Sequence, residues 1–267
     1  MPIDPLFFRS RGFLDMEERF GATDCIASVL EGRAKTQQEI RALEIGFGEG
    51  KCLLEMRSRF LEKKFEFYGV NSKPEGNMHA QSDLSVNAAR FGIDLNGADL
   101  PAIDFYDCGC GLCFPDGHLD IIVSQMCIYY VLDKAKLIEE CWRTLKDGGE
   151  AFLHIDTNPG KDLPDYMRLN IETPRFIVYD GTEVVRIEEI FGNKKEQGYD
   201  IIYLKSPNNP RHALLRMTKN RSDALHLDLC LDKLSSIDLN ILRNSDPSKS
   251  GQHIWFGTRS VYQLNGR

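Results

Sequence analysis

The stretch that most constrains the fold of this chain is residues 42–51, which read Ala-Leu-Glu-Ile-Gly-Phe-Gly-Glu-Gly-Lys. Three glycines alternate with other residues directly after an apolar, strand-like run, and a helical pattern begins at Lys51. Glycine reaches left-handed backbone conformations without a steric penalty, so such a loop allows a tight turn and the close approach of a ligand. The N-terminus of the next helix adds N–H groups that have no partner within the helix. The stretch therefore predicts a ligand-binding turn between a strand and a helix.

Strand-like and helical patterns alternate around this turn. Apolar runs predict strands at residues 42–45, 67–70, 103–106, 119–126 and 151–155, and helical patterns lie at residues 51–63, 79–91 and 133–146. The last helix places five apolar side chains on one face: Leu137, Ile138, Cys141, Trp142 and Leu145. Glycines follow it at residues 148–149, where a helix C-cap favours them. This alternation predicts an α/β fold, a parallel sheet with helices on both faces.

Further elements are expected outside this core. The patterns predict a short helix at residues 22–31, strands at 199–205 and 213–218 around a turn at 207–211, and a last strand at 253–256. Residues 175–187 suit a hairpin on an Asp-Gly signal, and a helix at residues 182–195 fits almost as well, so both alternatives stay open. Leucines alternate with polar residues from Leu225 to Leu231, the period of a half-buried strand. We divide the chain into an N-terminal helical cap (residues 1–40), a main domain (41–220) and a C-terminal extension of the same domain (221–267).

The spacing of the glycines favours one class of ligand. Dinucleotide sites carry G-x-G-x-x-G, in which a pyrophosphate meets the helix N-terminus. Here an acid, Glu44, precedes G-x-G-x-G. An acid suits a ligand that brings a cation, such as the amino-acid end of S-adenosylmethionine. An NAD-dependent oxidoreductase and a glycine-rich turn without any ligand stay open as alternatives.

Two later segments, taken with the glycine turn, resemble the class I S-adenosylmethionine-dependent methyltransferases. Residues 112–124 read Leu-Cys-Phe-Pro-Asp-Gly-His-Leu-Asp-Ile-Ile-Val-Ser, which is similar to the family's L-P-F-P-D-G-S-F-D-V-V-V-S run before its fourth strand. Residues 137–149 are similar to the family's L-x-E-x-x-R-V-L-K-P-G-G helix and turn before its fifth strand. The resemblance covers residues 42–158. It implies a Rossmann-like fold, a mostly parallel seven-stranded sheet with helices on both faces.

The same resemblance implies residues that would bind S-adenosylmethionine as the cofactor. Its methionine end would lie along Glu44, Gly46, Gly48 and Gly50. Asn71 ends the second strand, where the family has an acid for the ribose hydroxyls. An asparagine can both donate and accept hydrogen bonds, but it lacks the charge.

The resemblance also places residues around the adenine and the methyl group. Asp107 would face the adenine amino group with Cys108 beside it, and Ser124 and Gln125 would lie near the methyl group. Tyr129 follows the fourth strand, where many relatives carry histidines, and is a candidate for orienting the acceptor.

His154 and Asp156 stand at the end of the predicted fifth strand, the edge at which open α/β sheets bind ligands. Either residue could act as a general base if the acceptor is a hydroxyl. A packing or supporting role for both residues is equally open.

Two other features allow competing interpretations. Residues 107–113 contain three closely spaced thiols, but a closed zinc site needs four ligands and no paired cluster lies elsewhere, so we expect no metal. Residues 201–221 contain no acid and six basic or histidine side chains: Lys205, Arg211, His212, Arg216, Lys219 and Arg221. They form either a contact for an anionic substrate or RNA, or, as we prefer, a solvated face.

Composition bears on the partners and the compartment. The net charge is −7, which argues against nucleic acid as a partner. No apolar run is long enough for a membrane helix and no secretory pattern opens the chain, so we expect a cytoplasmic protein whose eight cysteines are thiols.

These observations predict a methyltransferase that uses S-adenosylmethionine on a small-molecule acceptor. Methyl transfer needs mainly the alignment of the acceptor, the methyl carbon and the sulfur. The alternatives are a binding module that keeps the fold without catalysis, and a methyltransferase that acts on RNA or protein. The oligomeric state is not predicted.

Overall fold

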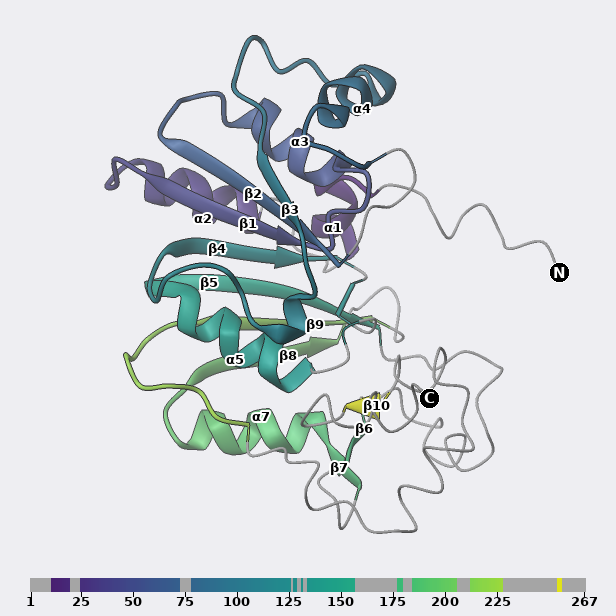
Figure 1. The fold of residues 1–267 in the computed structure, drawn as a ribbon. Coiled ribbons are helices and arrows are strands. Elements are labelled where there is room, and N and C mark those ends of the chain that lie inside the picture. The colour runs from purple at the N-terminus through teal and green to yellow at the C-terminus, as the bar shows by residue number, and fades with distance from the viewer. Residues whose placement is uncertain are drawn as a thin grey trace, which may run out of the picture.

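Seven strands form one sheet that runs through the molecule (Figure 1). The computed structural model describes residues 11–19, 25–72, 78–125, 127–128, 131, 134–156, 177–179, 184–205, 212–227 and 254–255. In sheet order, the strands are β3 (Ala102–Phe105), β2 (Phe65–Asn71), β1 (Ile40–Ile45), β4 (Leu119–Ser124), β5 (Leu145–Asp156), β9 (His212–Thr218) and β8 (Asp200–Lys205).

The strand directions make this a doubly wound sheet. Strands β1 to β5 pair in parallel, and β9 pairs antiparallel with both β5 and β8. The strand order reverses between β1 and β4, and in open α/β sheets ligands bind at the carboxyl edge of such a reversal. The predicted mostly parallel, seven-stranded sheet is confirmed.

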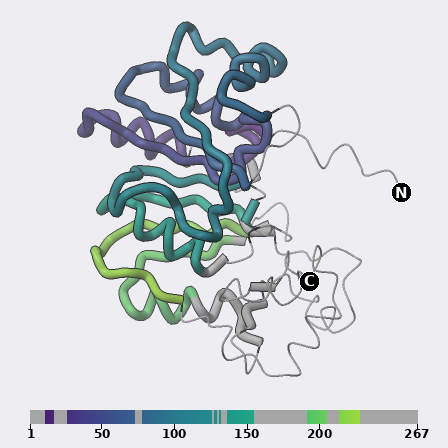
Figure 2. The backbone as a smooth tube through the Cα atoms, viewed as in Figure 1, coloured from purple at the N-terminus to yellow at the C-terminus, as the bar shows by residue number. Residues whose placement is uncertain are grey.

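Helices cover both faces of the sheet, as Figures 1 and 2 show. One apolar cluster combines residues of β1 and β2 with residues of α1 (Phe13–Arg19), α2 (Cys25–Ala34), α3 (Lys51–Arg59) and α4 (Asp83–Phe91). The second cluster combines the opposite side of the strands with α5 (Lys134–Thr144), η2 (Cys108–Cys110) and α7 (Ile187–Glu196). The apolar face predicted for α5 is buried: Leu137, Ile138, Cys141 and Trp142 are at most 1% exposed.

Residues 148–149 differ from the expectation. The last strand of the parallel set begins at Leu145 instead of Ala151, so the two glycines lie inside β5 and do not cap α5. The Gly148 N–H donates to the Lys219 carbonyl over 2.7 Å, and the Lys219 N–H donates to the Gly149 carbonyl over 2.9 Å. Pairing with a segment about seventy residues away, which no local pattern reports, extends the strand through the glycines.

Residues 177–196 combine the two alternatives that the sequence left open. Strands β6 (Ile177–Tyr179) and β7 (Val184–Arg186) pair antiparallel, and α7 begins directly after β7. Strand β10 (Ile254–Trp255) pairs parallel with β6, which makes a second, three-stranded sheet.

The strand predicted on the leucine alternation from Leu225 is wrong for residues 225–227, which are not in a strand. Leu225 and Leu227 are buried and His226 is exposed, so the alternation of burial is present without strand pairing. These leucines belong to the apolar cluster that contains Trp142, and the Leu227 N–H donates to Glu139 Oε1 over 2.8 Å. Residues 228–231 and the predicted turn at 207–211 lie outside the described residues.

The N-terminal helices lie against the main sheet. The predicted helix at residues 22–31 is α2, and α1 precedes it. The Phe13 N–H donates to Glu55 of α3 over 2.6 Å, which fixes the start of α1. In the part of the chain that the structure describes, no helix has the length and apolarity to cross a bilayer.

Candidate active site

The turn predicted from the glycines lies at the carboxyl end of β1 and leads into α3. Gly46, Gly48 and Gly50 have φ angles of +76°, +55° and +86°. A Cβ atom on Gly46 would lie 2.3 Å from the Cβ and Sγ of Cys127, whereas a Cβ on Gly48 would meet nothing within 4 Å. The backbone at Gly46 is therefore closed in by residues that follow β4, and the backbone at Gly48 faces open space.

Glu44 is 3% exposed and lies on the α3 face of β1. The Cys52 thiol and the Leu53 N–H, both at the start of α3, donate to its carboxyl group. Burial nevertheless raises the pKa of Glu44 to about 8. Its Oε2 atom is buried and has no hydrogen-bond partner among the described residues. Because a nearby cation favours the ionised form, this acid is suited to a positively charged group of a ligand.

Asn71, at the carboxyl end of β2, contacts the glycine turn directly. Its Oδ1 accepts from the Gly48 N–H over 3.2 Å, and its Nδ2 donates to the Gly48 carbonyl over 3.1 Å. Asn87 of α4 donates to the next carbonyl, that of Glu49, over 3.0 Å. Asn87 was not among the expected site residues, although an asparagine within a helix is a signal because its side chain competes for backbone hydrogen bonds.

Ser124 and Gln125 follow each other at the carboxyl end of β4. The Ser124 hydroxyl is fully buried and donates to the Ile45 carbonyl over 2.9 Å, so it joins the ends of β4 and β1. Gln125 is 7% exposed, and its Nε2 has no hydrogen-bond partner among the described residues. Of the two, Gln125 keeps a donor that a ligand could use.

Asp107 and Cys108 lie between β3 and β4. The Asp107 carboxylate caps η2 by accepting from the Gly109 N–H over 3.0 Å, and the side chain is exposed. Cys108 is buried, and burial with the neighbouring Asp107 charge raises the pKa of its thiol to about 12. This thiol stays protonated and packs as an apolar group. Asp107 has an exposed side, unlike the buried thiol of Cys108.

The residues proposed for chemistry lie on or after β5 and β4. His154 is fully buried in β5, opposite Leu214 of β9, and Asp156 is the last residue of β5. Strand alternation puts His154 on the same face as Phe152, which packs in the cluster of α1 to α4. The side chain of Asp156 and all of Tyr129 lie outside the described residues.

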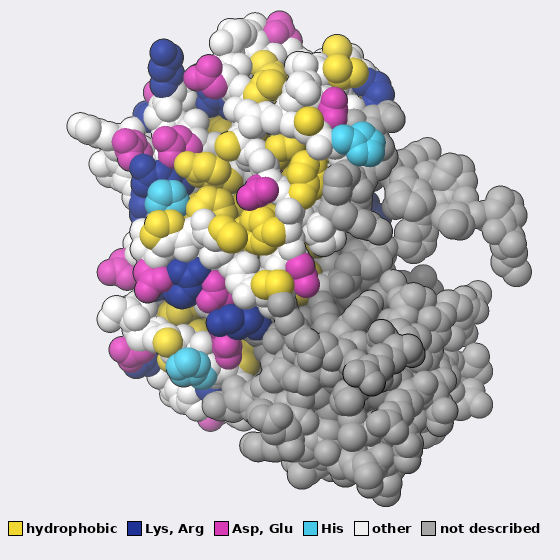
Figure 3. All heavy atoms as spheres, viewed as in Figure 1, with side chains coloured by type: hydrophobic (Ala, Val, Ile, Leu, Met, Phe, Trp, Pro, Cys, Tyr) yellow, Lys and Arg dark blue, Asp and Glu magenta, His cyan; other side chains and the backbone are white. Residues whose placement is uncertain are grey.

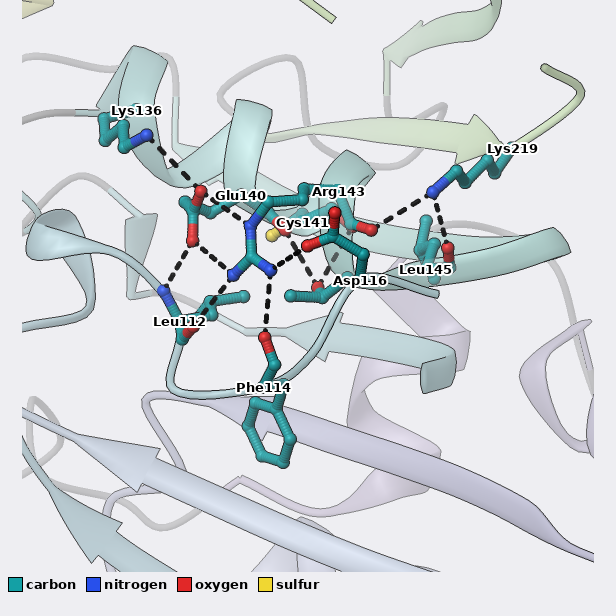
Figure 4. A network of polar contacts seen from close by, with 10 residues as sticks. Leu112, Phe114, Asp116, Lys136, Glu140, Cys141, Arg143, Leu145 and Lys219 are labelled. Atoms are coloured by element: carbon teal, nitrogen blue, oxygen red, sulfur yellow. Dashed lines mark hydrogen bonds and ion pairs between the residues drawn. The ribbon is translucent and has the colours of Figure 1, made fainter. Parts of the chain in front are cut away.

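A polar network that was not expected from the sequence holds the loop before β4 (Figure 4). Arg143 of α5 donates to the Leu112 carbonyl over 2.9 Å, to the Phe114 carbonyl over 3.0 Å and to Asp116 over 2.5 Å. Glu140 accepts from Arg143 over 2.7 Å and from the Leu112 N–H over 3.0 Å. Burial opposes ionisation of Glu140, but these donors hold its pKa at about 2. The network fixes the segment that follows Asp107 and Cys108.

Basic residues of the 201–221 run mostly serve internal contacts. Arg216 pairs with Glu150 over 2.6 Å, and Arg221 pairs with Asp223. Lys219 is 7% exposed and donates to the carbonyls of Arg143 and Leu145. The side chains of Lys205, Arg211 and His212 lie outside the described residues. On the face shown in Figure 3, acidic and basic side chains lie interspersed around hydrophobic ones instead of forming one basic area.

The thiols of residues 107–113 do not gather with other ligands. Cys110 and Cys113 are exposed whereas Cys108 is buried. Over the residues that the structure describes, no group of three or more His, Cys, Asp or Glu side chains could hold a metal ion.

The fold and the turn together place a candidate ligand site at the β1–β4 strand reversal of a doubly wound sheet. Residues 43–153 match the family model of the methyltransferase domain. Over this stretch, which is less than half of the chain, the protein is similar to the S-adenosylmethionine-dependent methyltransferases.

Solved structures of methyltransferases are similar to this chain at low identity. A methyltransferase of Methanosarcina mazei is 19% identical, with 71% of this chain and 96% of that chain covered and a TM-score of 0.44. One from Aquifex aeolicus is 13% identical, covers 81% and 98%, and has a TM-score of 0.45. Haemonchus contortus phosphoethanolamine N-methyltransferase 2 is 16% identical, covers 83% of this chain but 61% of its own, and has a TM-score of 0.46. No functionally curated protein matches the chain.

Proposed function

We propose that this enzyme methylates a small-molecule acceptor held at the carboxyl edge of β4 and β5. The observation that carries the proposal is a pair of buried polar atoms without partners among the described residues, Glu44 Oε2 and Gln125 Nε2. They lie on the neighbouring strand β1 and directly after β4, at the strand reversal. Buried polar groups are nearly always hydrogen-bonded, so an unpartnered acceptor and donor at a binding edge favour a polar ligand there.

The residues present fit the cofactor. Glu44 offers an acid for the ammonium group of the methionine end, and the open side of Gly48 lets a ligand approach the backbone. The exposed side of Asp107 is suited to accept a hydrogen bond from the adenine amino group. Cys108 contributes an apolar wall next to it. In this proposal Gly46 and Gly50 shape the turn, and Ser124 acts by holding β4 to β1.

Catalysis would rest mainly on positioning. The cofactor supplies a methyl group that its positive sulfur already activates. Gln125 would orient either the acceptor or the cofactor through its unpartnered Nε2. Holding the reacting groups in line lowers the barrier by removing translational and rotational freedom, so no strong acid or base is obligatory.

Asp156 is the better of the two candidates for a general base. It is the last residue of β5, at the carboxyl edge of the strand, whereas His154 is fully buried within the strand. We therefore propose a packing role for His154. Tyr129 stays a candidate for orienting the acceptor.

A small-molecule acceptor is also consistent with the surface. Arg216, Lys219 and Arg221 are engaged with acids or carbonyls of the same chain, which leaves them poorly suited to neutralise a phosphate backbone.

The test has two steps. Calorimetry with S-adenosylmethionine and S-adenosylhomocysteine should show binding, and Gln125→Leu should weaken it or lower turnover, whereas Gln37→Leu, an exchange far from the turn, should leave both unchanged. Transfer of a labelled methyl group is then measured on panels of small amines, carboxylic acids and hydroxyl compounds, and on RNA and protein fractions. Label appearing in RNA or protein alone would overturn the small-molecule proposal, and binding without any transfer would favour a non-catalytic module.

A further inference from the structure

Asn71 uses both ends of its side-chain amide on a single residue of the glycine turn. The Gly48 N–H donates to Oδ1 over 3.2 Å, and Nδ2 donates to the Gly48 carbonyl over 3.1 Å. The side chain is 4% exposed. A side chain that binds the hydroxyls of a ligand must have accessible polar atoms before the ligand arrives. Asn71 has almost no accessible surface.

The neighbouring peptide of the turn is held in the same way. Asn87 donates to the Glu49 carbonyl over 3.0 Å and is 1% exposed. Arg90 binds the Glu49 carboxylate over 2.5 Å. Two consecutive carbonyls of the turn are therefore fixed by asparagine amides, one from β2 and one from α4.

Only an amide can make the Asn71 pair of bonds. An ionised carboxylate accepts hydrogen bonds but cannot donate, so an aspartate at position 71 would leave the Gly48 carbonyl facing a negative oxygen. The asparagine is thus chemically matched to the turn, and the missing charge is explained by a contact within the protein.

We propose that Asn71 is a positioning residue that fixes the Gly48 peptide, and that it does not read the ribose hydroxyls of the cofactor. The part concerning ribose rests on the proposed placement of the cofactor, whereas the part concerning the turn does not. On this proposal the end of β2 contributes no discrimination between an adenosyl ligand and its 2′-deoxy form.

The first experiment measures hydrogen exchange of the Gly48 amide in the ligand-free protein. Loss of a typical hydrogen bond accelerates exchange by about tenfold, which is the increase expected in Asn71→Ala. Asn71→Asp keeps the size of the side chain and should accelerate exchange less, because one oxygen can still accept from the Gly48 N–H. Unchanged exchange at Gly48 in Asn71→Ala would overturn the positioning role.

Asn220 provides a matched control. It also bonds two backbone groups, donating to the Gly198 carbonyl over 2.9 Å and accepting from the Asp200 N–H over 3.4 Å. Asn220→Ala and Asn220→Asp should leave exchange at Gly48 at the wild-type rate.

The second experiment compares the affinities of S-adenosylhomocysteine and its 2′-deoxyribose analogue by calorimetry. We expect Asn71→Ala to weaken both ligands by a similar factor, about tenfold, so that the ratio of the two affinities matches that of the wild type. A ratio of about tenfold in the wild type that falls to about one in Asn71→Ala would show that Asn71 reads the hydroxyl, and would overturn the proposal. If the wild type binds neither ligand, the proposed function fails, and the exchange experiment still decides whether Asn71 holds the turn.

Discussion

A Cβ atom added to Gly46 would lie 2.3 Å from both the Cβ and the Sγ of Cys127. Gly46 also has a φ of +76°, which costs a residue with a side chain about 1–2 kcal/mol. Because overpacking adds about 1–3 kcal/mol, we expect Gly46→Ala to lower the free energy of unfolding by about 2–5 kcal/mol in urea titrations.

Gly48 is the control for that substitution, because its φ is also positive but a Cβ there would enter open space. Gly48→Ala should lower the free energy of unfolding by only about 1 kcal/mol. Its loss of binding free energy for S-adenosylhomocysteine should be larger than this loss of stability. Equal losses of stability in the two variants would contradict the difference in packing.

The Glu44 carboxyl group makes stability depend on pH. Its pKa rises from 4.5 to about 8 on folding because of burial, so the folded state binds more protons than the unfolded state between these values. The contribution of Glu44 to stability should therefore be greatest below pH 4.5 and should fall as the pH rises toward 8. Glu44→Gln mimics the protonated acid and should remove this slope. Denaturant titrations of the wild type and of Glu44→Gln from pH 5 to pH 9 measure the difference. If the unfolding free energies of the two proteins change in parallel with pH, the prediction is wrong.

Arg143 holds the loop before β4 through the carbonyls of Leu112 and Phe114. Arg143→Leu removes these bonds and leaves Glu140, which is 7% exposed, without its main partner. We expect a loss of about 2 kcal/mol, less than for a fully buried pair because Arg143 is one third exposed. Arg59→Leu breaks an exposed pair with Glu31 and should cost under about 1 kcal/mol. The prediction is wrong if thermal melts rank the two variants in the opposite order.

Trp142 connects α5 to the segment after β9. Its Nε1 donates to the Asp223 carbonyl over 2.8 Å, and its ring meets that of Tyr199 edge-on at 5.2 Å. Trp142→Phe leaves a cavity and an unpaired carbonyl, and we expect it to lower the unfolding free energy by about 2 kcal/mol. Tyr199→Phe loses a hydroxyl bond to the Ala224 carbonyl at an exposed site and should cost about 1 kcal/mol or less. Chemical denaturation of both variants gives the comparison, which fails if Trp142→Phe is as stable as the wild type.

The prediction of the core strands and of the turn at Gly46 succeeded because their signals are local. Apolar runs, helical periodicity in α5 and the glycines after β1 all lie within windows of a few residues. The prediction failed at Gly148 and at Leu225, where the same local signals were read correctly but a distant partner decided the outcome. Backbone hydrogen bonds with Lys219 extend β5 through the Gly148 region. Leu225 is buried in the cluster that contains the α5 residues, although it is not in a strand.

The amino-acid sequence was sufficient to predict the order of the core strands and helices, the position of the turn and the similarity of residues 43–153 to a methyltransferase domain, because periodicity and glycine placement act along the chain. The tertiary structure alone decided what the side chains at the site do. The Asn71 amide forms hydrogen bonds with Gly48, and the Ser124 hydroxyl donates to the Ile45 carbonyl. Glu44 lies buried against α3, and burial raises its pKa. Each of these roles depends on a partner that folding brings close and on the exclusion of water from the site. A local sequence pattern reports neither the partner nor the exclusion of water.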